Sequence, residues 1–280
     1  MRSGGDPADH AEEKHIMRIP ITMCHGIEEA LTVEHFTTLM QIAHDMGFQS
    51  ISYDDLDSWR NSSGALPPRP IMIDFDHPVK SIHSQILGIL SGFGFSANLF
   101  INTGGMDAPG AEPPSSKPGP ECMTWDEIGE LMEAGWLIGA HTVSHPNLSD
   151  LSVQDPSGQR VREELEQCDE TLEKHLGVRP RDFAYTATTW SSAAEREVMA
   201  RYRFGRLWII GAEYEANGKP IRFAELAGVP GPDEADGGPP HAARYITKET
   251  HAYRLPSMEL TALIHDPDAF CRYLEGALSP

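Results

Sequence analysis

Cysteine is scarce in this sequence of 280 residues, and no two cysteines lie close together along the chain. The four thiols are widely separated and form no Cys-x-x-Cys pair: Cys24, Cys122, Cys168 and Cys271. Disulfide frameworks and cysteine-based zinc sites normally show close and regular cysteine spacing. We therefore expect reduced, mostly structural thiols, as found in a reducing compartment.

Long apolar runs are also missing. No stretch of eighteen apolar residues occurs, so the sequence predicts no transmembrane helix and no membrane partner. Residues 1–16 are mostly polar and acidic, without the apolar segment of a signal peptide, and we expect them to form a disordered tail. The sequence thus predicts a cytoplasmic protein.

Positive charge is the third scarcity. The chain has 22 Lys and Arg against 42 Asp and Glu, which gives a formal net charge of −20. Such a protein would be repelled by the backbone of nucleic acids and by anionic membranes. Neutral or cationic small molecules and glycans are the partners that this charge favours. The sequence does not indicate an oligomeric state.

Strand-like apolar runs alternate with amphipathic helical stretches along nearly the whole chain. Residues 32–48 show a helical period, and residues 71–75 read as a buried strand. About six to eight such βα units predict an α/β fold with a parallel sheet closed into a barrel. We expect one domain over residues 17–280, with long loops at 102–121 and 212–253.

The stretch "GAHTVSHPN" places His141 and His145 four residues apart, directly after the strand-like run "WLIGA". Residues at this spacing share one face of a helical turn, so two imidazoles can bind one cation. Pro146 cannot continue a strand, so the pair lies on a loop or short turn. Two solvated loop histidines would give the same pattern, and a metal site needs a third ligand.

Two other polar stretches also follow predicted strands. "DFDH" ends the strand at 71–75, and "LIHD" lies in the last predicted strand, residues 260–267. In a parallel barrel the carboxyl ends of the strands meet on one face, where active sites are built. We therefore expect these stretches and the histidine pair to lie together.

With these motifs in order, the chain resembles the polysaccharide deacetylases of the NodB-homology type, carbohydrate esterase family four, from about residue 17 to residue 277. "IDFDHP" stands where the family has a strand ending in T-F-D-D-G, "HTVSH" matches H-[S/T]-x-x-H, and "LIH" matches the closing L-x-H. The resemblance implies a distorted (β/α) barrel of about seven parallel strands. It also implies a divalent metal that helps to remove N-acetyl, or sometimes O-acetyl, groups from sugars.

The resemblance assigns roles residue by residue. The family's general base corresponds to Asp76, and the family's aspartate ligand is replaced by a histidine, so the implied metal ligands are His77, His141 and His145. Zinc is the expected ion, because three imidazoles plus water suit catalytic zinc. An imidazole in place of a carboxylate also disfavours hard cations such as Mg²⁺.

A second register of "IDFDHP" stays open. Asp74 and Asp76 alternate along a strand and face one side. In this register Asp74 is the base and Asp76 the ligand, and His77 has a supporting or substrate-binding role. We favour the gapless register, in which Asp74 is a substrate-binding residue, because Phe75 then falls in place. A third reading is that Asp76 only caps a strand-to-helix turn.

Four further residues complete the predicted site. "LIH" makes His265 the general acid that protonates the leaving amine. His25 matches a strand-end position of the family and is expected to contact substrate at the site. Tyr185 and Trp190 carry apolar rings with polar tips and could line a substrate groove, although ordinary core packing explains them equally well.

The sequence-based hypothesis is a metal-dependent hydrolase that removes an N-acetyl or other N-acyl group from a sugar, either a small molecule or an oligosaccharide. The stretch "FAYTAT" departs from the family's F-x-x-P-Y-G, which shapes the acetate pocket. Two alternatives follow from this departure. One is a hydrolase of a non-sugar amide, cyclic imide or ureide on the same scaffold, and the other is a non-catalytic binding module.

Overall fold

The computed structural model of the protein describes residues 16–106, 121–187, 189–208, 213–216, 219–222 and 238–279. The predicted tail at 1–16, except its last residue, lies outside these ranges, as do residues 107–120 of the first predicted loop. All four cysteines are free thiols, as expected. Among the described residues, no helix has the length and apolar character needed to cross a bilayer.

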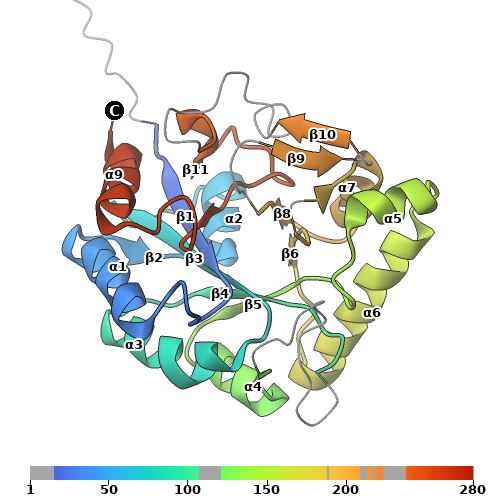
Figure 1. Ribbon diagram of the computed structural model, residues 1–280, viewed down its shortest axis with the longest axis horizontal. Helices are drawn as coiled ribbons and strands as arrows, with labels where there is room; N and C mark the ends of the chain where they lie inside the picture. The colour runs from blue at the N-terminus through green and yellow to red at the C-terminus, as the bar shows by residue number, and fades with distance from the viewer. Residues whose placement is uncertain are drawn as a thin grey trace, which may run out of the picture.

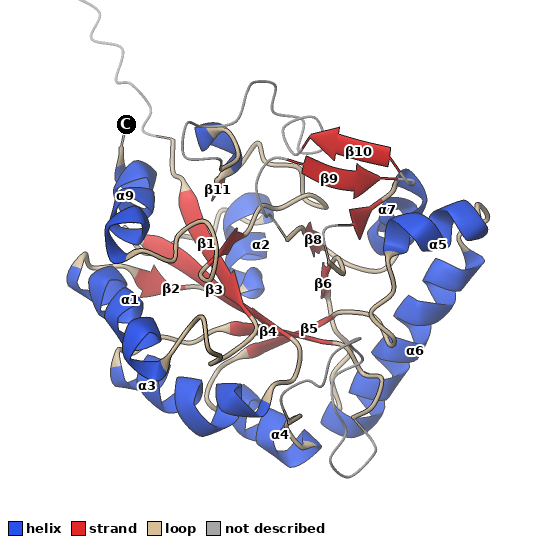
Figure 2. Ribbon diagram, in the orientation of Figure 1, coloured by secondary structure: helices blue, strands red, loops and turns tan. Residues whose placement is uncertain are grey.

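A curved, mostly parallel sheet forms the centre of the molecule (Figures 1 and 2). Its parallel strands follow one another in space in the order β12 (Met258–Glu259), β1 (Ile19–Cys24), β3 (Pro70–Asp76), β4 (Asn98–Ile101), β5 (Leu137–Ala140), β6 (Asp182–Ala184) and β8 (Phe204–Arg206). Two short strands add to this row: β2 (Gln49–Ser50) pairs parallel with β3, and β11 (Tyr245–Ile246) pairs antiparallel with β1. The distorted α/β barrel predicted from the sequence is confirmed.

One segment joins the two edges of the sheet. The backbone N–H of Gly205 donates to the carbonyl of Ala252, and that of Leu255 donates to the carbonyl of Gly205, both at 2.9 Å. A few residues later, Met258 and Glu259 pair with β1. The chain between 252 and 259 therefore bonds first to β8 and then to β1, which closes the barrel.

Helices surround the strands (Figure 1). They are α1 (Val33–Asp45), α2 (Tyr53–Asn61), the π-helical turn η1 (Ile82–Ile86), α3 (Leu87–Gly92), α4 (Trp125–Glu133), α5 (Leu148–Gln154), α6 (Gln159–Leu176), α7 (Ser192–Met199), the 3-10 turn η2 (His241–Ala243) and α9 (Pro267–Leu278). The helix predicted over residues 32–48 is α1, with Thr32 as its N-cap.

The second predicted loop, 212–253, is partly regular structure, which corrects the sequence-based prediction. It contains β9 (Glu213–Ala216) and β10 (Lys219–Arg222), which form a separate three-stranded sheet with β7 (Thr189–Trp190). It also contains η2 and β11. β9 and β10 pair with each other antiparallel, and the Asn-Gly sequence between them is a local hairpin signal that the sequence-based prediction did not use. Only the pairing of β9 with β7, more than twenty residues away along the chain, leaves no local sequence signal.

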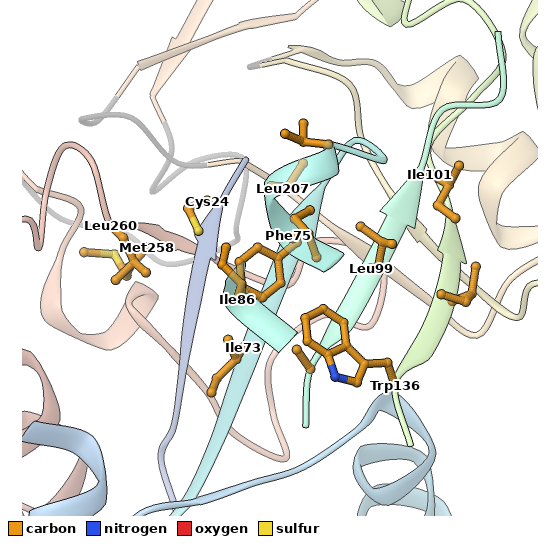
Figure 3. Packing of buried hydrophobic residues seen from close by; sticks show 14 of the residues in the cluster. Cys24, Ile73, Phe75, Ile86, Leu99, Ile101, Trp136, Leu207, Met258 and Leu260 are labelled. Atoms are coloured by element: carbon orange, nitrogen blue, oxygen red, sulfur yellow. The ribbon is translucent and has the colours of Figure 1, made fainter. Parts of the chain in front are cut away.

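Strand alternation separates an outer apolar face from the barrel interior. On β3, Ile71, Ile73 and Phe75 belong to the main hydrophobic core that also contains residues of the outer helices. Figure 3 shows Ile73 and Phe75 beside Leu99 of the next strand, with Trp136 nearby. The alternate residues Met72, Asp74 and Asp76 therefore face the interior, because successive side chains point to opposite faces.

Helix α2 covers one end of the barrel. Its buried side chains Tyr53, Leu56 and Trp59 belong to a second apolar cluster together with interior residues of the strands: Ile19, Ile21, Met72, Phe100, Ala184 and Phe204. This helix was not predicted from the sequence. Burial of this apolar surface fills the lower half of the barrel with side chains, so only the other half remains for polar groups.

An ionic layer lies above this apolar cluster. Arg206 is fully buried, with Nε 3.1 Å from Oδ2 of Asp74 and Nη2 hydrogen-bonded to Oδ1 of Asp76. Asp74 also accepts hydrogen bonds from the Tyr53 hydroxyl at 2.7 Å and from the Asn98 amide at 2.9 Å. Burial raises the pKa of Asp74 to about 7, and Arg206 opposes this rise by favouring the charged form. The strands are thus joined across the barrel by charged groups.

Removal of the Arg206 charge should strongly destabilise the fold. Arg206→Met leaves two buried carboxylates without their cation, which typically costs about 3–5 kcal/mol. We expect a loss of this size in the free energy of unfolding measured by urea denaturation.

Arg179→Met is the matched control, because its side chain is 60% exposed and lies 3.7 Å from Asp169. The control should change the stability by no more than about 0.5 kcal/mol. Equal stabilities of the two variants would show that the ionic layer does not hold the barrel together.

Candidate metal centre

Three histidines converge at the carboxyl ends of the strands. His77 directly follows β3, His141 directly follows β5, and His145 lies four residues further on. Each offers a ring nitrogen, and these nitrogens all lie within 4.8 Å of one another. The ring centroids are separated by 5.2 Å (His77–His141), 4.7 Å (His77–His145) and 4.9 Å (His141–His145).

The backbone that carries these histidines is strained. His77 (φ 67°), Thr142 (φ 67°) and His145 (φ 55°) all have left-handed backbone conformations, which are uncommon for residues other than glycine. Such strain persists only where the surrounding structure enforces it, and it clusters at functional sites. Here Glu164 of α6 accepts hydrogen bonds at 2.9 Å from the backbone N–H groups of Val143 and Ser144, which fixes the histidine loop.

Two of the rings are oriented by hydrogen bonds from Nδ1. His141 Nδ1 donates to the carbonyl of Ala184 at 2.8 Å, and His77 Nδ1 donates to Oδ1 of Asn102 at 2.7 Å. A carbonyl oxygen can only accept, so Nδ1 carries the hydrogen and Nε2 keeps its lone pair. Metal-binding histidines usually show this arrangement, with the other nitrogen held by a carbonyl or carboxylate.

Burial keeps the three imidazoles neutral. It lowers the pKa of His145 to about 3, with a further contribution from His77, and it lowers the pKa values of His77 and His141 below their usual range. Neutral imidazoles are good ligands for zinc and poor ligands for hard cations. The donors present therefore fit a zinc-like ion with three protein ligands.

Two further predicted residues lie beside this cluster. Asp76 immediately precedes His77 and is held by Arg206. His25, two residues beyond Met23 of β1, stacks on His77 at a centroid distance of 5.2 Å and meets the Trp208 ring edge-on at 5.3 Å. Burial lowers the pKa of His25 to about 4. The three residues whose possible ligand atoms lie close together include His77, and neither Asp74 nor Asp76 is among them. This favours the gapless register.

Asp74 and Tyr185 are both fully buried among other groups, and their contact with substrate stays a prediction. Asp74 is fully buried in the ionic layer, where Tyr53, Asn98 and Arg206 surround it. Tyr185 is also fully buried, in the outer core, with its ring 5.3 Å from that of Phe183. Strand alternation explains this, because Tyr185 shares the outer face with Phe183.

Trp190 lies on β7 of the smaller sheet. Its Nε1 donates to Glu195 at 2.9 Å, and the guanidinium of Arg254 lies 4.9 Å from its ring centre. Trp190 therefore lies beside the ion pair of Arg254 with Glu195. None of these contacts is with the three clustered histidines. A role in substrate binding stays a prediction. Thr188 of "FAYTAT" lies outside the described residues.

His265 packs against a histidine that is not one of these three clustered histidines. Its ring lies 4.3 Å from that of His35, in the first turn of α1, and its carbonyl accepts a hydrogen bond from Nε2 of His35 at 2.7 Å. The strand predicted over residues 260–267 is wrong, because β12 ends at Glu259 and residues 260–264 form turns. The chain turns before it reaches His265, so this residue does not end a barrel strand.

Four polar residues near the site were missed in the sequence. They are Asn102 after β4, Arg206 at the end of β8, Trp208 just beyond it, and Glu259 at the end of β12. The available signal was a polar residue at the carboxyl end of a barrel strand. At Arg206 this signal is hidden, because the apolar run "LWII" follows the residue in the sequence, whereas β8 ends with it.

Comparison with known proteins gives a consistent result. A sequence profile described as polysaccharide deacetylase matches residues 63–204. No curated protein sequence matches the chain. Among solved structures, the Streptococcus pyogenes deacetylase PplD in complex with acetate has a TM-score of 0.65 at 15% identity, over 95% of this chain and 100% of that one.

Two further structures are similar. IcaB from Ammonifex degensii has a TM-score of 0.66 at 13% identity, covering 94% of this chain and 98% of that one. The deacetylase domain of BpsB from Bordetella bronchiseptica has a TM-score of 0.64 at 16% identity, covering 87% and 96%. At these identities the likeness shows a shared fold.

Loss of any one of the three imidazoles should reduce metal binding. We expect the wild-type protein to hold one zinc ion per chain, and His77→Ala, His141→Ala and His145→Ala each to lose most of it after dialysis, because two ligands remain. Elemental analysis measures this. Asn102→Ala should weaken binding by about 10- to 100-fold, because the His77 ring loses its orientation.

His265→Ala is the matched control and should retain the full metal content, since its ring lies against His35. Full retention of zinc by His77→Ala would overturn the three-histidine site and favour the alternative register.

Proposed function

The chain belongs to the polysaccharide deacetylase family, and on this premise we propose that it is a metal-dependent hydrolase that removes an N-acetyl, or closely related N-acyl, group from a sugar or oligosaccharide. One observation carries the proposal: three neutral imidazole nitrogens lie within 4.8 Å of one another, next to the carboxylate of Asp76. The acetate in the PplD structure supports it, because acetate is the product of such a reaction.

The three histidines would hold the ion. A divalent metal bound there would lower the pKa of a water molecule and polarise an amide carbonyl, which are the two requirements of amide hydrolysis. The all-nitrogen donor set supports zinc over Mg²⁺ or Ca²⁺, which prefer oxygen ligands. It also distinguishes this chain from relatives that use an aspartate at the position of His77.

Asp76 is the proposed general base. Its Oδ1 is held by Arg206, and its Oδ2 can accept the proton of the attacking water. Arg206 is a positioning residue in this scheme, because it orients the carboxylate and is itself held by Asp74 and Ser257. The leaving amine also needs a proton, and the residue expected to supply it, His265, lies against His35.

Substrate screening tests the proposal directly. The zinc-loaded protein should release acetate from N-acetylglucosamine or its short oligomers and no ammonia from cyclic imides or ureides. A chelator should abolish the release and added Zn²⁺ should restore it. Ammonia release without acetate release would favour the non-sugar alternative, and neither product, at full metal content, would favour a binding module.

Asp76→Asn should separate base from ligand. The amide cannot accept the proton of water, so we expect kcat to fall by about 10²- to 10⁴-fold while the zinc content stays unchanged. In the alternative register this variant would lose its metal, and Asp74→Asn would be the metal-loaded, inactive protein. Zinc content and acetate release measured on both variants decide between the registers, with thermal unfolding as the check on folding.

A further inference from the structure

Glu259 points into the barrel at the level of the site. It is the last residue of β12 and pairs with Met23 of β1. Its neighbours Met258 and Leu260 both belong to the outer apolar core, and Figure 3 shows them together beside Cys24. Because successive residues of a strand face opposite sides, the Glu259 side chain between them faces the interior.

Contacts link this carboxyl to the histidine group. Trp208 Nε1 donates to Oε2 of Glu259 at 3.0 Å, and the Trp208 ring meets the His25 ring at 5.3 Å. His25 in turn stacks on His77 at 5.2 Å. Glu259 is 5% exposed, so it is a buried acid on the wall of the same site.

The surroundings of Glu259 differ from those of Asp76. Asp76 is paired with the cation Arg206, whereas the two hydrogen-bond partners of Glu259, Trp208 and Thr261, are neutral. Burial raises the pKa of Glu259; the hydrogen bonds from Thr261 and Trp208 oppose this rise, and the nearby carboxylates of Glu28 and Asp76 add to it. Two carboxyls with different surroundings on one site are the usual basis of an acid and base pair.

The hydrogen bonds indicate which oxygen carries the proton. An indole N–H can only donate, so Oε2 must act as an acceptor. The Thr261 hydroxyl donates to Oε1 at 2.5 Å, and a hydroxyl can turn to accept instead when Oε1 carries a hydrogen. Oε1 can therefore hold a hydrogen without losing its partner.

We propose that Glu259 is the general acid of this hydrolase, in the role that the sequence had suggested for His265. The proposal rests on the proposed function. Water adds its oxygen to the amide carbon, and one of its protons passes to Asp76. The C–N bond then breaks as Oε1 of Glu259 gives its proton to the nitrogen, which leaves as an amine. The other proton of the water stays on the acyl group, so the products are a carboxylic acid and an amine, and the proton on Asp76 returns to Glu259 through solvent.

Glu259→Gln tests the role with little change in shape. The amide oxygen can still accept from Trp208 and the amide N–H can donate to Thr261, so zinc content and the midpoint of thermal unfolding should match the wild type. On an N-acetylated sugar, kcat should fall by about 10²- to 10⁴-fold. On p-nitrophenyl acetate, whose leaving group needs no proton, the rate should change by less than about threefold.

His265→Gln is the matched control and should keep both activities within about threefold of the wild type. Equal losses on amide and ester in Glu259→Gln, a rise in KM with kcat unchanged, or a large loss in His265→Gln instead would each overturn the proposal. If the zinc-loaded wild type releases no acetate, the proposed function fails and this inference with it. An active wild type with an equally active Glu259→Gln removes only the inference.

Discussion

The interaction on which the rest of the structure depends is the pairing of one buried arginine with two buried aspartates. Arg206, fully enclosed, lies between Asp74 and Asp76 and also contacts Ser257. Charges taken out of water are costly unless each is paired and hydrogen-bonded, so every group of this layer needs the others. Strand β8, strand β3 and helix α2, through Tyr53, are fixed relative to one another by this requirement.

This layer divides the barrel into two halves with different functions. Below it, α2 closes the barrel with apolar side chains such as Leu56 and Trp59, which stabilise the fold. Above it lie the groups that can do chemistry. Asp76 is the first of these, because its Oδ1 is bound by Arg206 of the ionic layer while its Oδ2 is the proposed base. The next residue, His77, takes a left-handed conformation and so leaves the strand direction to meet His141 and His145. Strain in the histidine loop is held in place by contacts such as those of Glu164.

The site therefore contains polar groups of three kinds, each defined by its surroundings. Imidazoles that are buried and bonded through Nδ1 stay neutral and present Nε2. The carboxylate of Asp76 is oriented by the guanidinium of Arg206. Among the described residues, the hydrogen-bond partners of the Glu259 carboxyl are the neutral Trp208 and Thr261, and this carboxyl is the proposed proton donor. The same side-chain type thus supports opposite roles on neighbouring walls of one barrel, because burial and neighbouring charge differ between the two positions.

The sequence by itself determined the βα alternation, and with it the parallel barrel, because helical and strand periods are local properties of the chain. It also determined the pairing of His141 with His145 and the importance of "DFDH", because these residues are neighbours along the chain. Only the tertiary structure decided which side chains point into the barrel and where the strands end. A two-residue strand such as β12 exists only through its pairing with β1, far away in sequence, so its end at Glu259, rather than at His265, left no local signal. Likewise, the outward face of Tyr185 and the burial of Asp74 follow from strand register and from a cation, Arg206, that is 132 positions further along the chain than Asp74.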